Sequence, residues 1–122
     1  MDTLQFSELV DMRPDLMGCR LEWQPYARTF PPKEIYDGFI KKIAVKESSN
    51  ARRMTFEISD VRVCKPARHE GWRPTTPPPY IIMLLDGCPI QRNGEKIVIT
   101  LSLPFVDVFN VITIFTEQRK ED

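Results

Sequence analysis

Arg-Arg-Met-Thr-Phe-Glu-Ile-Ser-Asp-Val-Arg-Val-Cys, residues 52–64, is the stretch of this chain that most clearly indicates its fold. Met54, Phe56 and Ile58 alternate with polar residues, which is the period of a strand with one buried face. After Asp60 the apolar residues continue at odd-numbered positions. A shift of one residue in the alternation is what a β-bulge or a bend produces. The stretch therefore predicts a long strand that bends near its middle.

Two apolar segments downstream predict further strands. Residues 80–85 form a short continuous apolar run, which is typical of a buried central strand. Residues 96–103 alternate, with isoleucine and leucine at every odd-numbered position on one face. Asp-Gly and Asn-Gly dipeptides, both turn signals, lie between the two segments. We therefore expect the two segments to pair as a hairpin with a long loop.

Two other segments fit either a helix or a strand. Residues 34–46 carry apolar residues at helical spacing, but an Asp-Gly turn signal interrupts them, so we expect a strand over 38–46. Residues 105–116 also carry a helical stripe, whereas 111–116 are the β-branched and aromatic residues that strands prefer. We expect a short helical turn near 105–110 followed by a strand, and a single helix is the alternative.

The remaining segments have no clear period. Eleven prolines, gathered in clusters, favour extended loops over long helices. Residues 1–32 are expected to be an irregular leader that packs on the core, with a short amphipathic turn and an edge strand at 20–24. Residues 65–79 are expected to form a long proline-rich loop, and residues 117–122 a frayed tail.

These segments together predict one small domain. A chain of 122 residues has the usual length of one domain and can bury its own core. The fold class expected is α+β and mostly β: a single small antiparallel sheet or a partly open barrel, with one or two short helices. The strands around residues 38–60 are also compatible with an OB-like barrel. The expected core residues are Met54, Phe56, Ile58, Ile82, Leu84, Ile97, Ile99, Leu101, Phe105, Phe109 and Ile112.

Few residues in the chain suit catalysis or metal binding. The only histidine, His69, lies in the proline-rich segment, and no nucleophile elbow, zinc-protease motif or phosphate-binding loop occurs. The three cysteines are far apart in sequence, as expected for free thiols in a reducing compartment. We therefore expect no enzyme activity, no cofactor and no metal. Because no signal peptide or membrane-length apolar run occurs, a cytoplasmic or nuclear location is expected.

The leading functional hypothesis is a protein-binding or assembly module, such as an adaptor, that binds a protein partner or itself. Pro77-Pro78-Pro79-Tyr80 matches the P-P-x-Y pattern recognised by WW domains, although a rigid entry into the next strand is the favoured explanation of these residues. The apolar C-terminal segment could supply an interface. A viral structural or accessory protein also fits this size and motif. The candidate residues are Trp72, Pro77, Pro78, Pro79, Tyr80, Phe105, Phe109 and Phe115.

The alternative hypothesis is a domain that binds single-stranded nucleic acid. Residues 38–73 hold nine basic and four acidic residues, an excess of five positive charges in a chain of zero net charge. Basic side chains neutralise phosphates and exposed rings stack on bases. The alternative interpretation is that this basic segment packs against the acidic ends of the chain and that its charges are only solvated. The candidate residues are Lys41, Lys42, Lys46, Arg52, Arg53, Arg62, Lys65, Arg68, Trp72 and Arg73.

Overall fold

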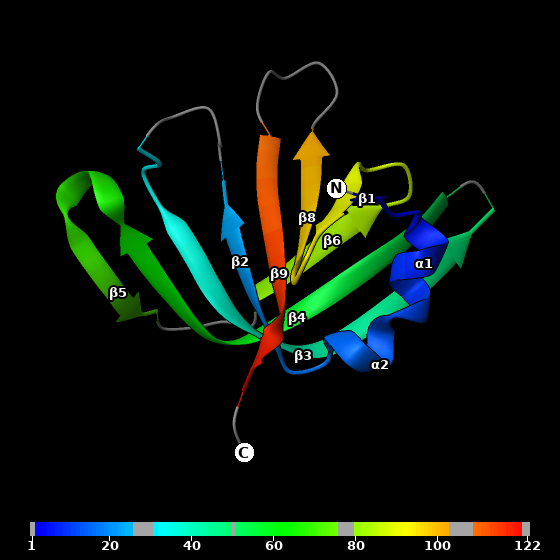
Figure 1. The fold of residues 1–122 in the computed structure, drawn as a ribbon, viewed down its shortest axis with the longest axis horizontal. Helices are drawn as coiled ribbons and strands as arrows, with labels where there is room; N and C mark the ends of the chain where they lie inside the picture. The colour runs from blue at the N-terminus through cyan, green and yellow to red at the C-terminus, as the bar shows by residue number, and fades with distance from the viewer. Residues whose placement is uncertain (1, 26–30, 50, 76–79, 103–108, 121–122) are drawn as a thin grey trace.

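The computed structural model describes residues 2–25, 31–49, 51–75, 80–102 and 109–120, which form one open antiparallel sheet with two short helices (Figure 1). The helices are α1 (Phe6–Asp11) and α2 (Arg13–Leu16), and a 3₁₀ turn, η1, spans Pro66–Arg68. The nine strands of the described residues are β1 (Asp2–Thr3), β2 (Cys19–Gln24), β3 (Ile35–Ser48), β4 (Ala51–Lys65), β5 (Glu70–Pro74), β6 (Tyr80–Leu85), β7 (Ile90–Asn93), β8 (Lys96–Ser102) and β9 (Phe109–Arg119). This confirms the expected fold class.

The sheet has a branched order, because one long strand pairs with two strands along the same edge. The path runs β1-β7-β8-β9-β2-β3-β4-β5, and β6 pairs with β4 as well. β6 occupies the first half of β4, from Arg53 to Ile58, and β5 occupies the end, from Arg62 to Lys65. The bend of β4 separates these two partners.

That bend lies where the alternation of the sequence shifts. Asp60 has a positive φ of 54°, and the register with β3 slips between Asp37 and Phe39. Gly38 faces this bulge, and a Cβ atom there would lie 2.7 Å from the carbonyl oxygen of Ser59. Gly38 therefore allows a close backbone approach inside β3 rather than a turn, and the strand expected over 38–46 is confirmed as part of a longer one.

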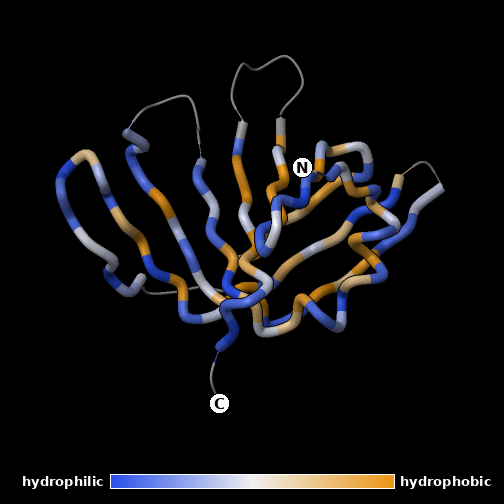
Figure 2. Tube along the Cα trace, in the orientation of Figure 1, coloured by the Kyte–Doolittle hydropathy of each residue, from blue (hydrophilic) through white to orange (hydrophobic). Residues whose placement is uncertain are grey.

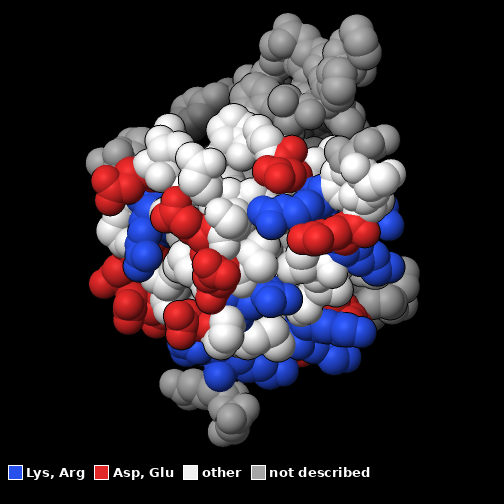
Figure 3. All heavy atoms as spheres, turned by 90° about the vertical axis from the view of Figure 1, so that its right-hand side faces the viewer, with Lys and Arg blue, Asp and Glu red and all other residues white. Residues whose placement is uncertain are grey.

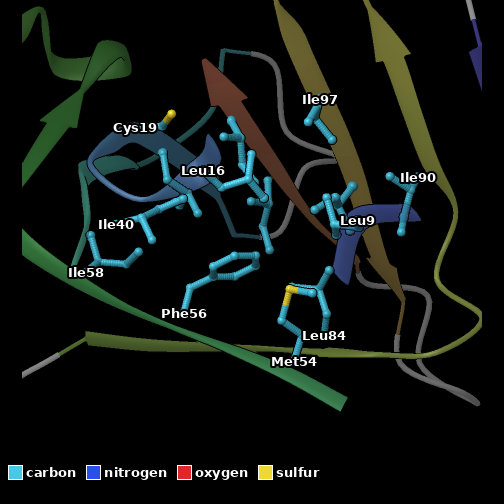
Figure 4. Close-up of a cluster of buried hydrophobic side chains, with 14 of the residues drawn as sticks. Leu9, Leu16, Cys19, Ile40, Met54, Phe56, Ile58, Leu84, Ile90 and Ile97 are labelled. Atoms are coloured by element: carbon cyan, nitrogen blue, oxygen red, sulfur yellow. The ribbon is translucent and has the colours of Figure 1, made fainter. Parts of the chain in front are cut away.

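The leader is not irregular, which corrects the expectation for residues 1–32. The amphipathic turn near its start is α1, and α2 follows it directly. Leu9 and Leu16 from these helices are fully buried, and Figure 4 shows them beside Phe56 and Leu84. β2 is a central strand and not an edge strand, because it pairs with both β3 and β9. Helices of six and four residues are too short to show a helical period in the sequence.

The expectation of a loop over residues 65–79 is also wrong for residues 65–74, which belong mostly to regular elements. Residues 66–68 form η1, and residues 70–74 form β5, which extends the sheet beyond the end of β6. Most of β5 is hydrophilic, as Figure 2 shows, so it has no alternating pattern. Residues 76–79 lie outside the described residues.

The strand pairing expected for residues 80–85 is wrong as well. Both segments are strands, but β8 forms its hairpin with β7, and β6 pairs with β4. Two short turns divide the expected long loop, and β7 fits between them. Within the described residues β6 has one strand neighbour, so it lies at an edge and not at the centre of the sheet.

The C-terminal segment is a strand from Phe109 onward. The helical turn expected near 105–110 is therefore wrong at residues 109–110, and residues 105–108 lie outside the described part. The expectation of a frayed tail is wrong for residues 117–119, because these residues continue β9. Arg119 donates hydrogen bonds to the carbonyl oxygens of Asp15 (2.6 Å) and Met17 (3.2 Å), so contacts to the α2 region hold this end.

The core fills the inside of the curved sheet, with the helices contributing from one side (Figures 1 and 4). Seven of the expected core residues are buried: Met54, Phe56, Ile58, Leu84, Ile97, Ile99 and Ile112. Ile82 and Leu101 pack against them while partly exposed, and the side chains of Phe105 and Phe109 lie outside the description. The buried residues that the sequence analysis missed are Phe6, Leu9, Leu16, Cys19, Leu21, Ile40, Val61, Ile90 and Ile114.

Candidate functional site

β6 presents a row of apolar side chains to solvent. Ile81 is 63% exposed, Met83 48% and Leu85 51%, and they occupy alternate positions on one face of the strand. The intervening Leu84 is fully buried in the core. A row of exposed apolar residues on an edge strand is unusual, since natural edges generally carry charges, prolines or bulges that prevent pairing.

The same three residues direct their backbone polar groups away from the sheet. The amide of Asp86 donates to the carbonyl oxygen of Arg52 at 3.0 Å, which fixes the phase of the antiparallel pairing. In such a ladder alternate residues bond to the neighbour, so the even-numbered residues of β6 face β4. The N–H groups of Ile81, Met83 and Leu85 therefore point to the open edge. The Leu85 carbonyl oxygen accepts the amide of Cys88 at 3.3 Å.

An apolar groove of about 260 Å³ lies beside this edge. β6 provides one wall, and the other wall comes from the ends of β2, β8 and β9. The lining residues are Trp23, Pro25, Ile81, Ile82, Met83, Leu101, Asn110 and Ile112. Within the described residues the edge therefore combines amides that have no strand partner with apolar surface on both sides of the strand, which is what an added strand requires.

Charged side chains flank the apolar row on neighbouring strands. The register places Glu57 of β4 beside Ile81 and Arg53 beside Leu85, with Thr55 beside Met83 between them. β3 continues these rows with Lys42 next to Glu57 and with Lys46 next to Arg53. Figure 3 shows both signs of charge on one side of the molecule: acidic groups are more frequent to the left, basic groups to the right and along the lower rim, and further acidic groups lie among the basic ones at the upper right.

A second cluster crosses the sheet through stacked cations and rings. The Arg20 guanidinium lies 4.7 Å from the Phe115 ring and 5.7 Å from the Trp72 ring. Arg62 lies 5.0 Å from Trp72, and the Lys96 ammonium lies 5.5 Å from Phe115. Each contact is within the range of a cation–π interaction. The cluster links β5 to β2, β4, β8 and β9.

Asp37 anchors this cluster as the one buried charged residue of the described part. Its carboxylate accepts hydrogen bonds from Arg20 Nε at 2.9 Å and from Arg62 Nε and Nη2 at 3.0 and 2.6 Å. The hydrogen bonds to Asp37 raise the pKa of Arg62. Because these cations already contact the rings and the carboxylate, the cluster is suited to holding β5 in place.

The residues predicted for protein binding do not come together in the described structure. Pro77, Pro78, Pro79 and Phe105 lie outside the described residues, as do the side chains of Tyr80 and Phe109. Trp72 and Phe115 belong to the cation–π cluster, where Arg20 contacts both. The sequence analysis missed Ile81, Met83 and Leu85, since a uniform apolar run does not show which residues are exposed.

The ten residues predicted for nucleic-acid binding separate into distant groups. Lys42, Lys46 and Arg53 lie in the rows beside β6, and Lys41 is exposed at the nearby β3 bulge. Lys65, Arg68 and Arg73 belong to the far end of β4 and to the η1–β5 region, and Arg62 and Trp72 are in the cation–π cluster. Twelve residues separate Arg53 from Lys65, roughly 40 Å along an extended strand. They are not one patch.

Arg52 is the remaining member of that set, and it is already engaged. Its guanidinium lies 3.7 Å from the Glu47 carboxylate, 3.6 Å from that of Asp86 and 5.0 Å from the Phe6 ring. Arg52 therefore helps to hold α1 against the β3–β4 hairpin.

In the described residues no group of three or more histidine, cysteine or acidic side chains is placed to hold a metal ion. Neither described helix is long and apolar enough to cross a membrane. No family model, no curated protein and no solved structure matches this chain.

Proposed function

We propose that this chain is a non-catalytic assembly module in which β6 pairs with β6 of a second copy. The observation that supports this most strongly is the coincidence of two features at Ile81, Met83 and Leu85. Their side chains are exposed and apolar, and their amides point to an edge without a strand neighbour in the described residues. Either feature alone is common, but together they match a surface that is covered by another strand.

A second copy fits this edge through two-fold symmetry. Antiparallel pairing about Met83 places Met83 opposite its own counterpart and Ile81 opposite Leu85 of the second copy. All contacts in the row are then apolar against apolar, which is the self-complementarity of a two-fold interface. Aliphatic and sulfur-containing side chains directly opposite each other stabilise such a pair.

The flanking charges favour the same arrangement. Glu57 lies beside Ile81 and Arg53 lies beside Leu85, so the two ends of the row differ in sign next to β6. Two-fold pairing brings the Glu57 end of one copy to the Arg53 end of the other. Parallel pairing in register would set Arg53 against Arg53 and Glu57 against Glu57. Because the two β4 strands would lie roughly 14 Å apart across the junction, this charge pattern adds only a weak preference for the antiparallel dimer over the parallel one.

One of the two segments expected from the sequence to bind protein contributes to the groove beside this edge, and the other precedes β6 in the sequence. Residues 77–79 directly precede β6 in the sequence, and Asn110 and Ile112 of the C-terminal segment line the groove beside it. We propose that both segments belong to the assembly surface, and that the P-P-x-Y motif acts there or as the entry into β6.

The test is the molar mass by light scattering of the wild type and of Met83→Lys, over a range of protein concentrations. We expect a wild-type dimer that persists in high salt, because its contacts are apolar, and a monomeric Met83→Lys variant. Gln91→Lys, which adds the same charge at an exposed position of β7, should leave the dimer intact. A wild type that is monomeric throughout, or a Met83→Lys dimer, would refute the proposal.

Binding of single-stranded nucleic acid is a second proposal, and one observation favours it. Lys42, Lys46 and Arg53 are close together in the rows beside β6. Binding of an oligonucleotide by phosphate contacts would weaken steeply as salt rises, whereas the apolar β6 dimer would not. Light scattering at low and high salt, with the nucleic-acid absorbance recorded, separates the two proposals.

A further inference from the structure

A second cavity lies at the opposite end of β4 from the part that pairs with β6. It has a volume of about 320 Å³ and is lined by Lys33, Glu34, Lys65, Ala67 and Arg68. The pairing of Ile35 with Cys64 brings these two segments together, although more than 30 residues separate Lys33 from Lys65 in the sequence. The cleft is therefore a product of the β3–β4 register.

The lining carries three cationic groups and one carboxylate. The Glu34 carboxylate accepts a hydrogen bond from the Tyr36 hydroxyl at 2.6 Å, so part of its acceptor capacity is already used. Within the described ranges, Lys33, Lys65 and Arg68 have no carboxylate close enough for an ion pair. Glu70 lies opposite Lys65 in the β4–β5 register but does not line the cleft, so the described lining itself carries an excess of positive charge. An excess of positive charge in a concave site concentrates anions there.

We propose that this cleft binds a small phosphate ligand of the diphosphate class. Its volume equals that of about ten water molecules in the liquid, which is enough for two linked phosphate groups. The planar fork of Arg68 suits bidentate phosphate contacts, and the two lysines supply point charges. The site uses none of the β6 residues and is independent of the proposed dimer.

The lining also argues that the phosphate group, and not a nucleobase, is recognised. Among the described residues that line the cleft none is aromatic, so the described lining offers a base no ring on which to stack. The nearby Trp72 ring already has Arg20 and Arg62 against it. A ligand held here is therefore recognised by charge and by hydrogen bonds to its oxygens.

The experiment is calorimetric titration of the full chain with pyrophosphate, inorganic phosphate and a single-stranded oligonucleotide. We expect saturable pyrophosphate binding that is tighter than phosphate binding, and an affinity at least about tenfold lower in Lys65→Gln/Arg68→Gln, which loses two charge-assisted contacts. Lys41→Gln/Lys42→Gln removes the same charge elsewhere and should retain binding. Glu34→Gln should bind pyrophosphate more tightly, because it removes the carboxylate of the described lining.

Three outcomes would overturn the proposal. They are an absence of pyrophosphate binding, an equal loss in both double variants, and oligonucleotide binding without pyrophosphate binding. Amide chemical shifts recorded during the titration provide a second measurement. The largest changes should fall on Ala67 and its neighbours in the cleft, and changes confined to residues outside it would equally contradict the assignment.

Discussion

Asp37 shows how one residue can hold several strands together. It lies in β3, its side chain is buried, and the two arginines that it binds come from β2 and β4. Burying one carboxylate costs free energy unless its oxygens are bonded, and here three N–H groups satisfy them. The two arginines in turn contact Trp72 of β5, so the position of β5 depends on Asp37.

Replacing Asp37 by Asn should therefore destabilise the fold strongly. The change removes the anion of Arg62 and one of the two carboxylates of Arg20, whose other partner is Glu22 at 2.9 Å. Losing the hydrogen bonds to a buried carboxylate in this way typically costs about 1–3 kcal/mol. Asp86→Asn is the control, because Asp86 is half exposed and its ion pair with Arg52 should contribute less than about 1 kcal/mol. Urea unfolding of both variants measures the difference. Equal losses of stability would contradict the role given to Asp37.

The Asp60–Lys120 ion pair predicts a weak dependence of stability on acid. Hydrogen bonding and attraction from Lys120 lower the pKa of Asp60 in the folded chain. A folded pKa below the unfolded value stabilises the fold above the unfolded pKa, near 4, and this contribution is lost as pH falls through the folded pKa. Because both side chains are half exposed, the effect on stability is small.

Titration by NMR is the direct measurement of that pair. In Lys120→Gln the pKa of Asp60 should return towards the ordinary aspartate value, since both of the larger causes of its shift are removed. Lys46→Gln, which removes a lysine beside Arg53 and so seven residues along β4 from Asp60, should leave the Asp60 titration unchanged. An unchanged Asp60 titration in Lys120→Gln would show that the ion pair does not form in solution.

At the scale of single elements, the sequence predicted strands where their pattern was local and regular. The alternation over residues 52–64 predicted β4 and the position of its bend, and the odd-numbered apolar residues after Lys96 predicted β8. Strand partners depend on distant segments, so β6 was assigned to the wrong hairpin. β5 was missed because it has few apolar residues, and its packing depends on the cation–π contacts of Trp72.

The alternation of backbone hydrogen bonds along β6 predicts where the strand tolerates proline. Proline lacks an N–H and is tolerated at edge positions where that group faces outward. Met83→Pro should therefore fold. Leu84→Pro should be strongly destabilised, because it removes an amide that bonds to β4 and a buried leucine side chain, whose loss alone costs about 2–5 kcal/mol. Thermal unfolding followed by circular dichroism compares the two variants. The opposite order of stabilities would mean that the ladder phase is wrong.

At the scale of the whole molecule, the central feature is an open sheet curved around a core, with one apolar edge. The fold class and most of the expected core follow from the sequence, because burial of alternate apolar residues is a general rule. The candidate site on β6 does not follow from the sequence, since residues 80–85 are all apolar or aromatic and the sequence alone does not distinguish buried from exposed positions among them. Only the position of β6 at an edge shows that Ile81, Met83 and Leu85 are left exposed.

The most direct test of the β6 dimer is hydrogen exchange of individual backbone amides as protein concentration rises. At low concentration the amides of Ile82 and Leu84 should exchange slowly, because they bond to β4, while those of Ile81 and Met83 exchange fast. At concentrations where the dimer forms, Ile81 and Met83 should become protected. If they stay fast while light scattering reports a dimer, the two copies associate elsewhere, and the role proposed for β6 is wrong.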